Sequence, residues 1–278
     1  MRRYLLDVAE YLIDTFGIDG MRLDAANELD FSFMSELRQI ATAQKADFWL
    51  MGEVVHGDYA RWVNADTLHS VTNYIMFKSL FSSHNDNNLF ELAYNQQHSV
   101  PSQGVPLYNF LDNHDQPRIA SNVHNPAFLG TLHTLLFTLP GITSIYYGSE
   151  WGIHGRKENN SDQPLRPYIS IENPPNDVPW LEDYIRKLAG IRQGHKALKC
   201  GGYRQVYLEY HKPLVFERKY ENERIFVVVN IGDAQEYVNL VEEHHGSVFD
   251  LLSNEHFHQH STYAIPVVPY SSRILKAE

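Results

Sequence analysis

The feature that most constrains the fold is an alternation of helix-like and strand-like segments with a repeat of about 30 residues. Residues 1–16 and 31–44 carry apolar side chains at helical spacing, whereas 18–23 and 48–55 are short apolar runs typical of buried strands. Further strands are expected at 70–77, 105–115 and 142–150. Because strands that alternate with helices pair in parallel through helical crossovers, the first two thirds of the chain is predicted to be α/β.

Polar residues end several of these strands at regular intervals. Asp24, Glu53, Asp115 and the region of Gly148 follow one another at roughly one, two and one repeats. A (β/α)8 barrel has this repeat and places its chemistry at the carboxyl ends of its strands. A doubly wound open sheet has a similar repeat, although no glycine-rich phosphate-binding turn follows any strand.

The sequence pattern changes near residue 200. A helix-like segment, 180–194, leads into a series of short apolar runs separated by polar turns, which is typical of a small antiparallel β-sandwich. The expected strands are 203–210, 213–220, 224–230, 236–241, 247–252 and 261–275. We therefore predict two domains, a barrel portion at 1–199 and a β-sandwich at 200–278.

Composition excludes several classes of protein. The 278 residues carry a formal net charge of −11, which argues against a nucleic-acid partner. No apolar run reaches the ~20 residues of a membrane-spanning helix, and the first residues lack the apolar core of a signal peptide. A cytoplasmic location without a membrane partner is expected. The single cysteine, Cys200, cannot form an internal disulfide.

Three strand-end carboxylates carry the predicted chemistry. If the strands share a barrel, Asp24, Glu53 and Asp115 converge on one mouth, where a close carboxyl pair suits a retaining glycosidase. Arg22 lies two residues before Asp24, hence on the same strand face, and could stabilise the ionised nucleophile. A single acid at a strand end is usually a helix cap or a solvated residue, but three in phase, each near an Arg or a His, favour catalysis.

Four segments in order resemble signature regions of the α-amylase family of glycoside hydrolases. They are GIDGMRLDAANE at 17–28, MGEVVH at 51–56, FLDNHD at 110–115 and IYYGSEWG at 145–152. Residues 185–205 and 214–230 resemble that family's last barrel helix and C-terminal β-domain. The sequences around Asp24 and at 161–167 are most similar to those of the neopullulanase, cyclomaltodextrinase and maltogenic-amylase branch.

The resemblance implies a role for individual residues. Asp24 matches the nucleophile, Glu53 the general acid/base and Asp115 the acid that stabilises the transition state. Arg22 matches the arginine that orients the nucleophile, and His114 the histidine that contacts the sugar at the cleaved bond. An acid–arginine pair near the donor sugars is matched by Asp162 and Arg166. The implied reaction is retaining hydrolysis of α-1,4-glucosidic bonds in maltooligosaccharides, cyclodextrins or starch-type α-glucans.

The family pattern is interrupted in two places. Val55 stands where this branch commonly has a Trp, which removes a stacking surface on the acceptor side. The family's first signature is absent, and about five strand–helix units stand where a closed barrel needs eight. The sequence therefore predicts a partial (β/α)8 barrel that lacks its first three strands. We expect its open edges to be covered in a homo-oligomer or by a chain that supplies the missing part.

Two other functional interpretations are open from the sequence. A non-catalytic relative, such as the amylase-like ectodomains of amino-acid transporter heavy chains, would lack the catalytic acids and carry a membrane helix, whereas this chain keeps all three acids and has no apolar run long enough for such a helix. A non-catalytic carbohydrate-binding or truncated relic domain of an amylase would retain only affinity for sugar. Tyr147 and Trp151 could stack on a sugar in the eighth-strand loop.

No cofactor is expected, although a structural calcium is compatible with the resemblance. A group of histidines near the C-terminus is the main metal-binding pattern to weigh, because HFHQH would place three of them on one strand face. No fourth ligand has a convincing spacing, so solvated turn and edge residues are the favoured interpretation and no metal site is assigned. These histidines are His244, His245, His256, His258 and His260.

Overall fold

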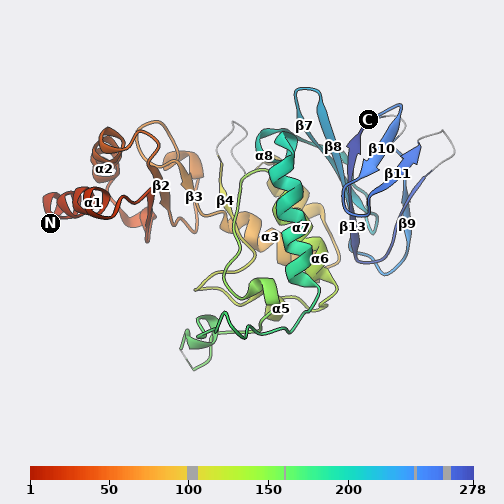
Figure 1. Cartoon of the computed structure of the whole chain (residues 1–278), viewed down its shortest axis with the longest axis horizontal. Coiled ribbons are helices and arrows are strands. Elements are labelled where there is room, and N and C mark those ends of the chain that lie inside the picture. Colours follow the sequence, from red (N-terminus) through yellow and green to blue (C-terminus); the bar gives the residue numbers. More distant parts are fainter. Residues whose placement is uncertain (99–105, 160, 241–242, 259–263) are drawn as a thin grey trace. The chain divides into compact units, whose positions relative to one another are not determined.

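The computed structural model describes residues 1–98, 106–159, 161–240, 243–258 and 264–278. Two compact units are formed (Figure 1). The first comprises Met1–Met76 and Asn95–Asn109, and the second comprises Phe77–Tyr94 and Phe110–Glu278. The predicted division into 1–199 and 200–278 stays a prediction.

A three-stranded parallel sheet organises the first unit, in the order β1-β2-β3. Leu23 pairs with Gly52, and Gly52 pairs in turn with Val71. The parallel pairing predicted from the helix–strand alternation is therefore confirmed for these strands. The elements of this unit are α1 (Arg2–Phe16), β1 (Gly20–Leu23), η1 (Ala26–Glu28), α2 (Phe31–Gln44), β2 (Trp49–Gly52), η2 (Tyr59–Arg61), β3 (Ser70–Val71) and β4 (Tyr108–Asn109).

Both helices expected in this unit form at the predicted residues. The first, α1, ends at Gly17, whose φ of 63° is left-handed and whose N–H donates to Ile13 O at 2.9 Å. Asp30 caps α2 by accepting from Ser32 N at 2.7 Å. The two helices pack against each other, and their apolar faces join the buried side of the sheet in one core. Its members include Leu6, Ile13, Met34, Leu37, Leu50 and Leu68.

One glycine in this unit is fixed by close packing. At Gly52, the last residue of β2, an added Cβ would lie 2.5 Å from Leu68 Cδ1 and 2.7 Å from the Cβ of Ala26. Both distances are shorter than any normal carbon–carbon contact. The residue before Glu53 must therefore lack a side chain for β2 to lie this close to its neighbours.

Several helices join the units or belong to the second. Two of them, α3 (Tyr74–Asn85) and α4 (Phe90–His98), cross the boundary between the units along the chain. Within the second unit, the almost wholly buried α6 packs beside α7 (Figure 1). The remaining elements before the C-terminal sheet are α5 (Ile119–Asn122), α6 (Phe128–Thr138), β5 (Ile142–Thr143), η3 (Ser149–Trp151), η4 (Gln163–Leu165), α7 (Leu181–Gly194) and α8 (Lys196–Cys200).

The C-terminal part is the predicted antiparallel sandwich. Six strands pair in the order β11-β10-β13-β8-β7-β6, and a β12-β9 pair packs over them around a core that contains Val215, Phe226 and Val267. The opposite face of the central strands packs on α6 and α8, so β7 and β8 are buried on both faces. The strands are β6 (Gly202–Tyr207), β7 (Leu214–Tyr220), β8 (Glu223–Asn230), β9 (Glu236–Val238), β10 (Ser247–Asp250), β11 (Glu255–His258), β12 (Ile265–Val267) and β13 (Ser271–Ala277).

Several expected strands are wrong in extent. Of the run 105–115 only Tyr108–Asn109 is a strand, and of the run 142–150 only Ile142–Thr143 is one, with η3 beginning at Ser149. Residue 105 lies outside the described residues. The run 70–77 is a strand only at Ser70–Val71, because Asn73 Oδ1 accepts from Met76 N at 3.1 Å and starts α3. The run 261–275 divides into β12 and β13 at a turn where Tyr270 has a φ of 51°. Residues 261–263 of that run lie outside the described residues.

Candidate active site

Asp24 and Glu53 leave the sheet side by side. β1 ends at Leu23 and β2 ends at Gly52, and these two residues are partners in the parallel register. The ladder continues beyond the strands, because Glu53 N donates to Leu23 O and Ala26 N donates to Glu53 O, both at 2.8 Å. Each carboxylate is therefore the first residue past the carboxyl end of its strand, as the sequence predicted.

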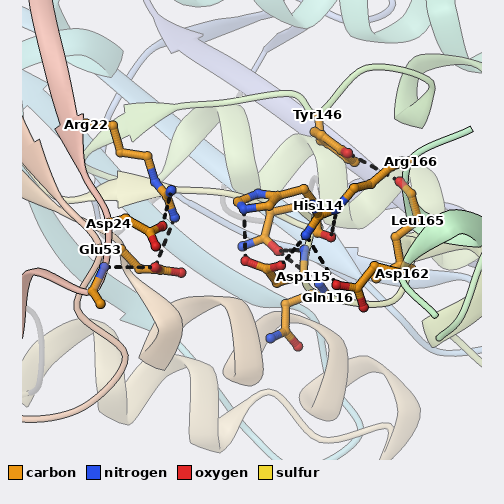
Figure 2. Close-up of polar contacts among 12 residues, drawn as sticks. Arg22, Asp24, Glu53, His114, Asp115, Gln116, Tyr146, Asp162, Leu165 and Arg166 are labelled. Atoms are coloured by element: carbon orange, nitrogen blue, oxygen red, sulfur yellow. Dashed lines mark hydrogen bonds and ion pairs between the residues drawn. The ribbon is translucent and has the colours of Figure 1, made fainter. Parts of the chain in front are cut away.

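One arginine contacts both carboxylates (Figure 2). Arg22 Nη1 lies 2.6 Å from Asp24 Oδ1, and Arg22 Nη2 lies 3.1 Å from Glu53 Oε2. The side chain of Asp24 is 78% exposed, whereas that of Glu53 is only 12% exposed. A single positive charge thus faces two acids, one open to a substrate and one largely enclosed.

Glu53 has further neighbours that the sequence did not point to. Ala25, held at a left-handed φ of 43°, directs its N–H toward Glu53 Oε2 at 3.4 Å. The hydroxyl of Tyr74 donates to the other oxygen, Oε1, at 3.1 Å. Tyr74 lies inside the run expected to be a strand, and only the parallel pairing of β2 with β3 brings it next to Glu53.

The second unit assembles the other predicted site residues around Asp115 (Figure 2). His114 Nε2 lies 2.9 Å from Asp115 Oδ2, and Arg166 Nη2 lies 2.8 Å from Asp115 Oδ1. The same arginine contacts Asp162 Oδ2 at 3.3 Å, and its Nε donates to His114 O at 3.0 Å. Asp162 also pairs with Lys157 at 3.0 Å. The expected acid–arginine pair therefore forms and is joined to Asp115.

Turn chemistry and buried groups hold this second cluster. Asn113 Oδ1 accepts from the backbone N–H groups of Asp115 and Gln116, both at 2.9 Å, which fixes the turn. Asp112 is buried and accepts from the hydroxyl of Ser149 at 2.6 Å and from Ile119 N at 2.9 Å. Burial raises the pKa of the Asp112 carboxyl, while these hydrogen bonds act in the opposite direction.

Arg118 is a further support that the sequence did not point to. Its side chain is completely buried, and its guanidinium donates to Tyr147 O at 2.6 Å and to Leu165 O at 2.8 Å. It also lies 4.1 Å from the ring centroid of Tyr146. Arg118 thereby connects the eighth-strand loop to the residue that precedes Arg166.

The remaining predicted residues have local partners. Tyr147 is 41% exposed and its hydroxyl donates to Pro167 O at 2.9 Å, while Trp151 Nε1 donates to Glu182 at 3.1 Å. Sugar stacking on these two rings stays a prediction. The convergence of Asp115 with Asp24 and Glu53 in one mouth also stays a prediction.

The C-terminal histidines and the cysteine were the remaining residues considered for metal binding or disulfide formation. Within the described parts of the chain, no cluster of three or more His, Cys, Asp or Glu side chains is arranged to hold a metal ion. His260 lies outside those parts, and His256 Nδ1 contacts Glu278 at 3.2 Å. Cys200 is exposed and not disulfide-bonded.

Comparison with known proteins identifies the family. Residues 1–187 match the model of the α-amylase catalytic domain, and residues 203–274 match the maltogenic amylase C-terminal domain. The chain belongs to the α-amylase family, with an α-amylase catalytic-domain region followed by an antiparallel β C-terminal domain. The neopullulanase and maltogenic-amylase resemblance seen in the sequence is confirmed by named relatives.

Relatives and solved structures agree with this assignment. The chain is 30% identical to a cyclomaltodextrinase from Geobacillus thermopakistaniensis, covering 97% of this chain and 47% of that protein. It is 28% identical to neopullulanase 2 from Thermoactinomyces vulgaris, covering 99% of this chain and 48% of that protein. The structure of an α-amylase from Geobacillus thermoleovorans superposes with a TM-score of 0.85 at 23% identity, covering 99% of this chain and 63% of that one.

The chain thus spans about half the length of these curated relatives. Among the residues that the structure describes, no helix combines the length and the apolar character that crossing a membrane requires.

Proposed function

We propose that this chain carries the reacting groups of a retaining α-glucan hydrolase. The observation that supports this most directly is the pairing of Asp24 and Glu53 at the ends of adjacent parallel strands, with both acids in contact with Arg22. The relatives named cyclomaltodextrinase and neopullulanase favour maltooligosaccharides, cyclodextrins or starch-type α-glucans as substrates.

The proposed reaction has two steps. In the first, the Asp24 carboxylate forms a bond to the anomeric carbon while the bond from that carbon to the glycosidic oxygen breaks, and Glu53 gives its proton to the departing oxygen. In the second, Glu53 takes a proton from water, the water oxygen bonds to the anomeric carbon, and the ester bond to Asp24 breaks. The product keeps the α configuration, and both carboxyl groups return to their starting states.

The other predicted residues take supporting roles. Arg22 orients Asp24, and Asp115 stabilises the positive charge that develops on the sugar ring. His114 contacts the sugar at the cleaved bond, and Asp162 with Arg166 binds donor sugars. No step requires a cofactor or a metal ion, and a structural calcium would lie outside these steps.

The test is release of reducing sugar from maltohexaose and β-cyclodextrin by the wild-type chain, Asp24→Asn and Glu53→Gln. We expect each variant to lose about 10³-fold or more in activity, because each removes a group that takes part in bond making. Glu28→Gln is the matched control and should retain activity, since Glu28 is an exposed acid close to Asp24 in the chain that accepts a hydrogen bond from Asn27 Nδ2.

The anomeric configuration of the products provides a second test. NMR of the first products should show the α anomer, and β anomers would contradict a retaining mechanism. Maltohexaose binding without turnover, unchanged in Asp24→Asn, would instead favour the carbohydrate-binding alternative.

We further propose that the chain works in a homo-oligomer or with a chain that supplies further barrel strands. Four large apolar side chains on α1 are exposed, which supports a covered face there: Tyr4, Leu5, Tyr11 and Phe16. Sedimentation at micromolar concentration should show an assembly larger than one chain, and a monomer would contradict the homo-oligomer.

A further inference from the structure

We propose that Tyr74 is a positioning residue that holds the Glu53 carboxyl through both of its protonation states. This inference rests on the proposed function, in which Glu53 donates a proton in the first step and accepts one in the second. It concerns a side chain to which no role is assigned from the sequence, and all of the contacts that carry it lie within the first unit.

The two oxygens of Glu53 have different surroundings. Oε2 lies 3.1 Å from Arg22 Nη2 and 3.4 Å from Ala25 N, and both of these groups can only donate hydrogen bonds. An added proton on Oε2 would point at donors and repel them. The proton of the neutral acid therefore belongs on Oε1, which is the oxygen that Tyr74 contacts at 3.1 Å.

A tyrosine hydroxyl suits this position because it can both donate and accept. When Glu53 is ionised, the hydroxyl donates to Oε1. When Oε1 carries the proton, its remaining lone pair can still accept from the hydroxyl, or the hydroxyl can turn and accept from the acid. Tyr74 thus keeps the carboxyl in place before and after proton transfer, and a phenylalanine could do neither.

The segment that carries Tyr74 is itself fixed to the chain around Glu53. Thr72 Oγ1 accepts from Val54 N at 2.9 Å and donates to Val54 O at 3.1 Å, so it braces the residue that follows Glu53. Asn73 Nδ2 donates to Asn109 Oδ1 at 2.8 Å, and its Oδ1 caps α3. Tyr74 is only 8% exposed. The end of β3 therefore holds the backbone after Glu53 through Thr72 and its side chain through Tyr74.

A matched control lies beside the site. Tyr59 is also buried, and its hydroxyl accepts from Ile75 N at 3.3 Å, on the residue next to Tyr74. Tyr59→Phe therefore removes one buried hydroxyl that contacts the same segment, without removing a contact to Glu53. Tyr74→Phe makes the same chemical change and removes the contact.

The experiment compares kcat/KM of the full chain on maltohexaose and on α-maltosyl fluoride. Fluoride leaves without taking a proton from a carboxyl group, so the first step on that substrate does not depend on Glu53 as an acid. Tyr74→Phe should lower kcat/KM on maltohexaose about tenfold and leave that on the fluoride within about twofold. Tyr59→Phe should stay within about twofold on both substrates.

A double variant gives a second measurement. In the Glu53→Gln background the carboxyl that Tyr74 holds is gone, so adding Tyr74→Phe should cost less than about twofold on maltohexaose. A full additional tenfold loss would show that Tyr74 acts on something other than Glu53.

Besides that result, three others would overturn the proposal, and they are distinguishable. An equal loss on both substrates would assign Tyr74 to sugar binding or folding, and no loss on maltohexaose would leave it without a role in proton transfer. Absence of turnover of either substrate by the wild-type chain in its proposed assembly would refute the proposed function, and the role of Tyr74 would fall with it.

Discussion

The acids of the two units differ in how their charge is balanced. In the first unit, Asp24 and Glu53 share one cation, Arg22, and the remaining oxygen of Glu53 meets a neutral hydroxyl. In the second unit, Asp115 and Asp162 share Arg166, but Asp162 also has Lys157, and Asp115 has His114. The pair assigned to bond making is thus left with an excess of negative charge, whereas Arg166 and Lys157 balance the two acids of the cluster assigned to binding.

This difference fits the tasks that we propose for the two groups. A carboxyl group that donates a proton must be protonated before the reaction. Negative charge that its neighbours leave uncompensated favours this protonated form. Residues that grip hydroxyl groups gain instead from fixed, fully paired charges that hold their geometry.

The largest effect is expected when the two arginines are compared. Arg22→Lys should lower kcat about 10²–10³-fold, because a lysine cannot reach two carboxylates on separate strands with a planar fork. Arg166→Lys should act mainly on KM, by about tenfold, since it belongs to the binding cluster. Equal effects on kcat would break the distinction between the two groups.

A smaller effect is expected on the strand that positions Glu53. Gly52→Ala should lower the free energy of unfolding by about 2–3 kcal/mol and reduce activity, because its Cβ would collide with Leu68 and Ala26. Gly190→Ala in α7, where nothing lies within 4 Å, should be neutral or stabilising by about 0.5–1 kcal/mol. Urea denaturation of both variants measures the two values, and similar values would contradict the tight packing at Gly52.

The smallest effect concerns acid stability of the second unit. Burial lowers the pKa of both His84 and His133 to about 4. Because each folded pKa lies below the unfolded value of about 6.5, the stabilisation is present above that value and is lost as the pH falls from about 6.5 toward 4. Each histidine should account for about 2 kcal/mol of the loss between pH 7.5 and pH 5.

The check is the pH dependence of urea denaturation in His84→Gln, which should lose part of that slope. His256→Gln, at an exposed histidine, is the control and should keep the slope of the wild-type chain. An unchanged slope in His84→Gln would contradict the buried neutral state.

The parts of the molecule differ in how well the sequence predicts them. Asp24 and Glu53 could be placed because each directly follows an apolar run, and the strand period puts Arg22 on the face of Asp24. The start of α3 could not be predicted, because Tyr74, Ile75 and Phe77 also favour strands. The capping hydrogen bond that Asn73 Oδ1 accepts from Met76 N overrides that preference.

Contacts between strands were the main information that the sequence lacked. Tyr74 lies 21 positions after Glu53 and reaches it only through the pairing of Gly52 with Val71. Arg118 similarly connects residues 147 and 165, which no local pattern links to it. Residues that take part in bond making follow strand ends and are visible in the sequence, whereas their supports depend on the register of strands and the course of loops.

In the proposed mechanism, Asp24 forms the covalent bond to the sugar while Glu53 transfers the proton. The most direct measurement is intact-protein mass spectrometry of Glu53→Gln after incubation with α-maltosyl fluoride, followed by peptide mapping. We predict one added maltosyl group, on Asp24, because the fluoride departs without acid catalysis and the second step lacks its base. A label on another acid would contradict this mechanism. It would also be contradicted if Glu53→Gln carried no label and the wild-type chain released the β anomer.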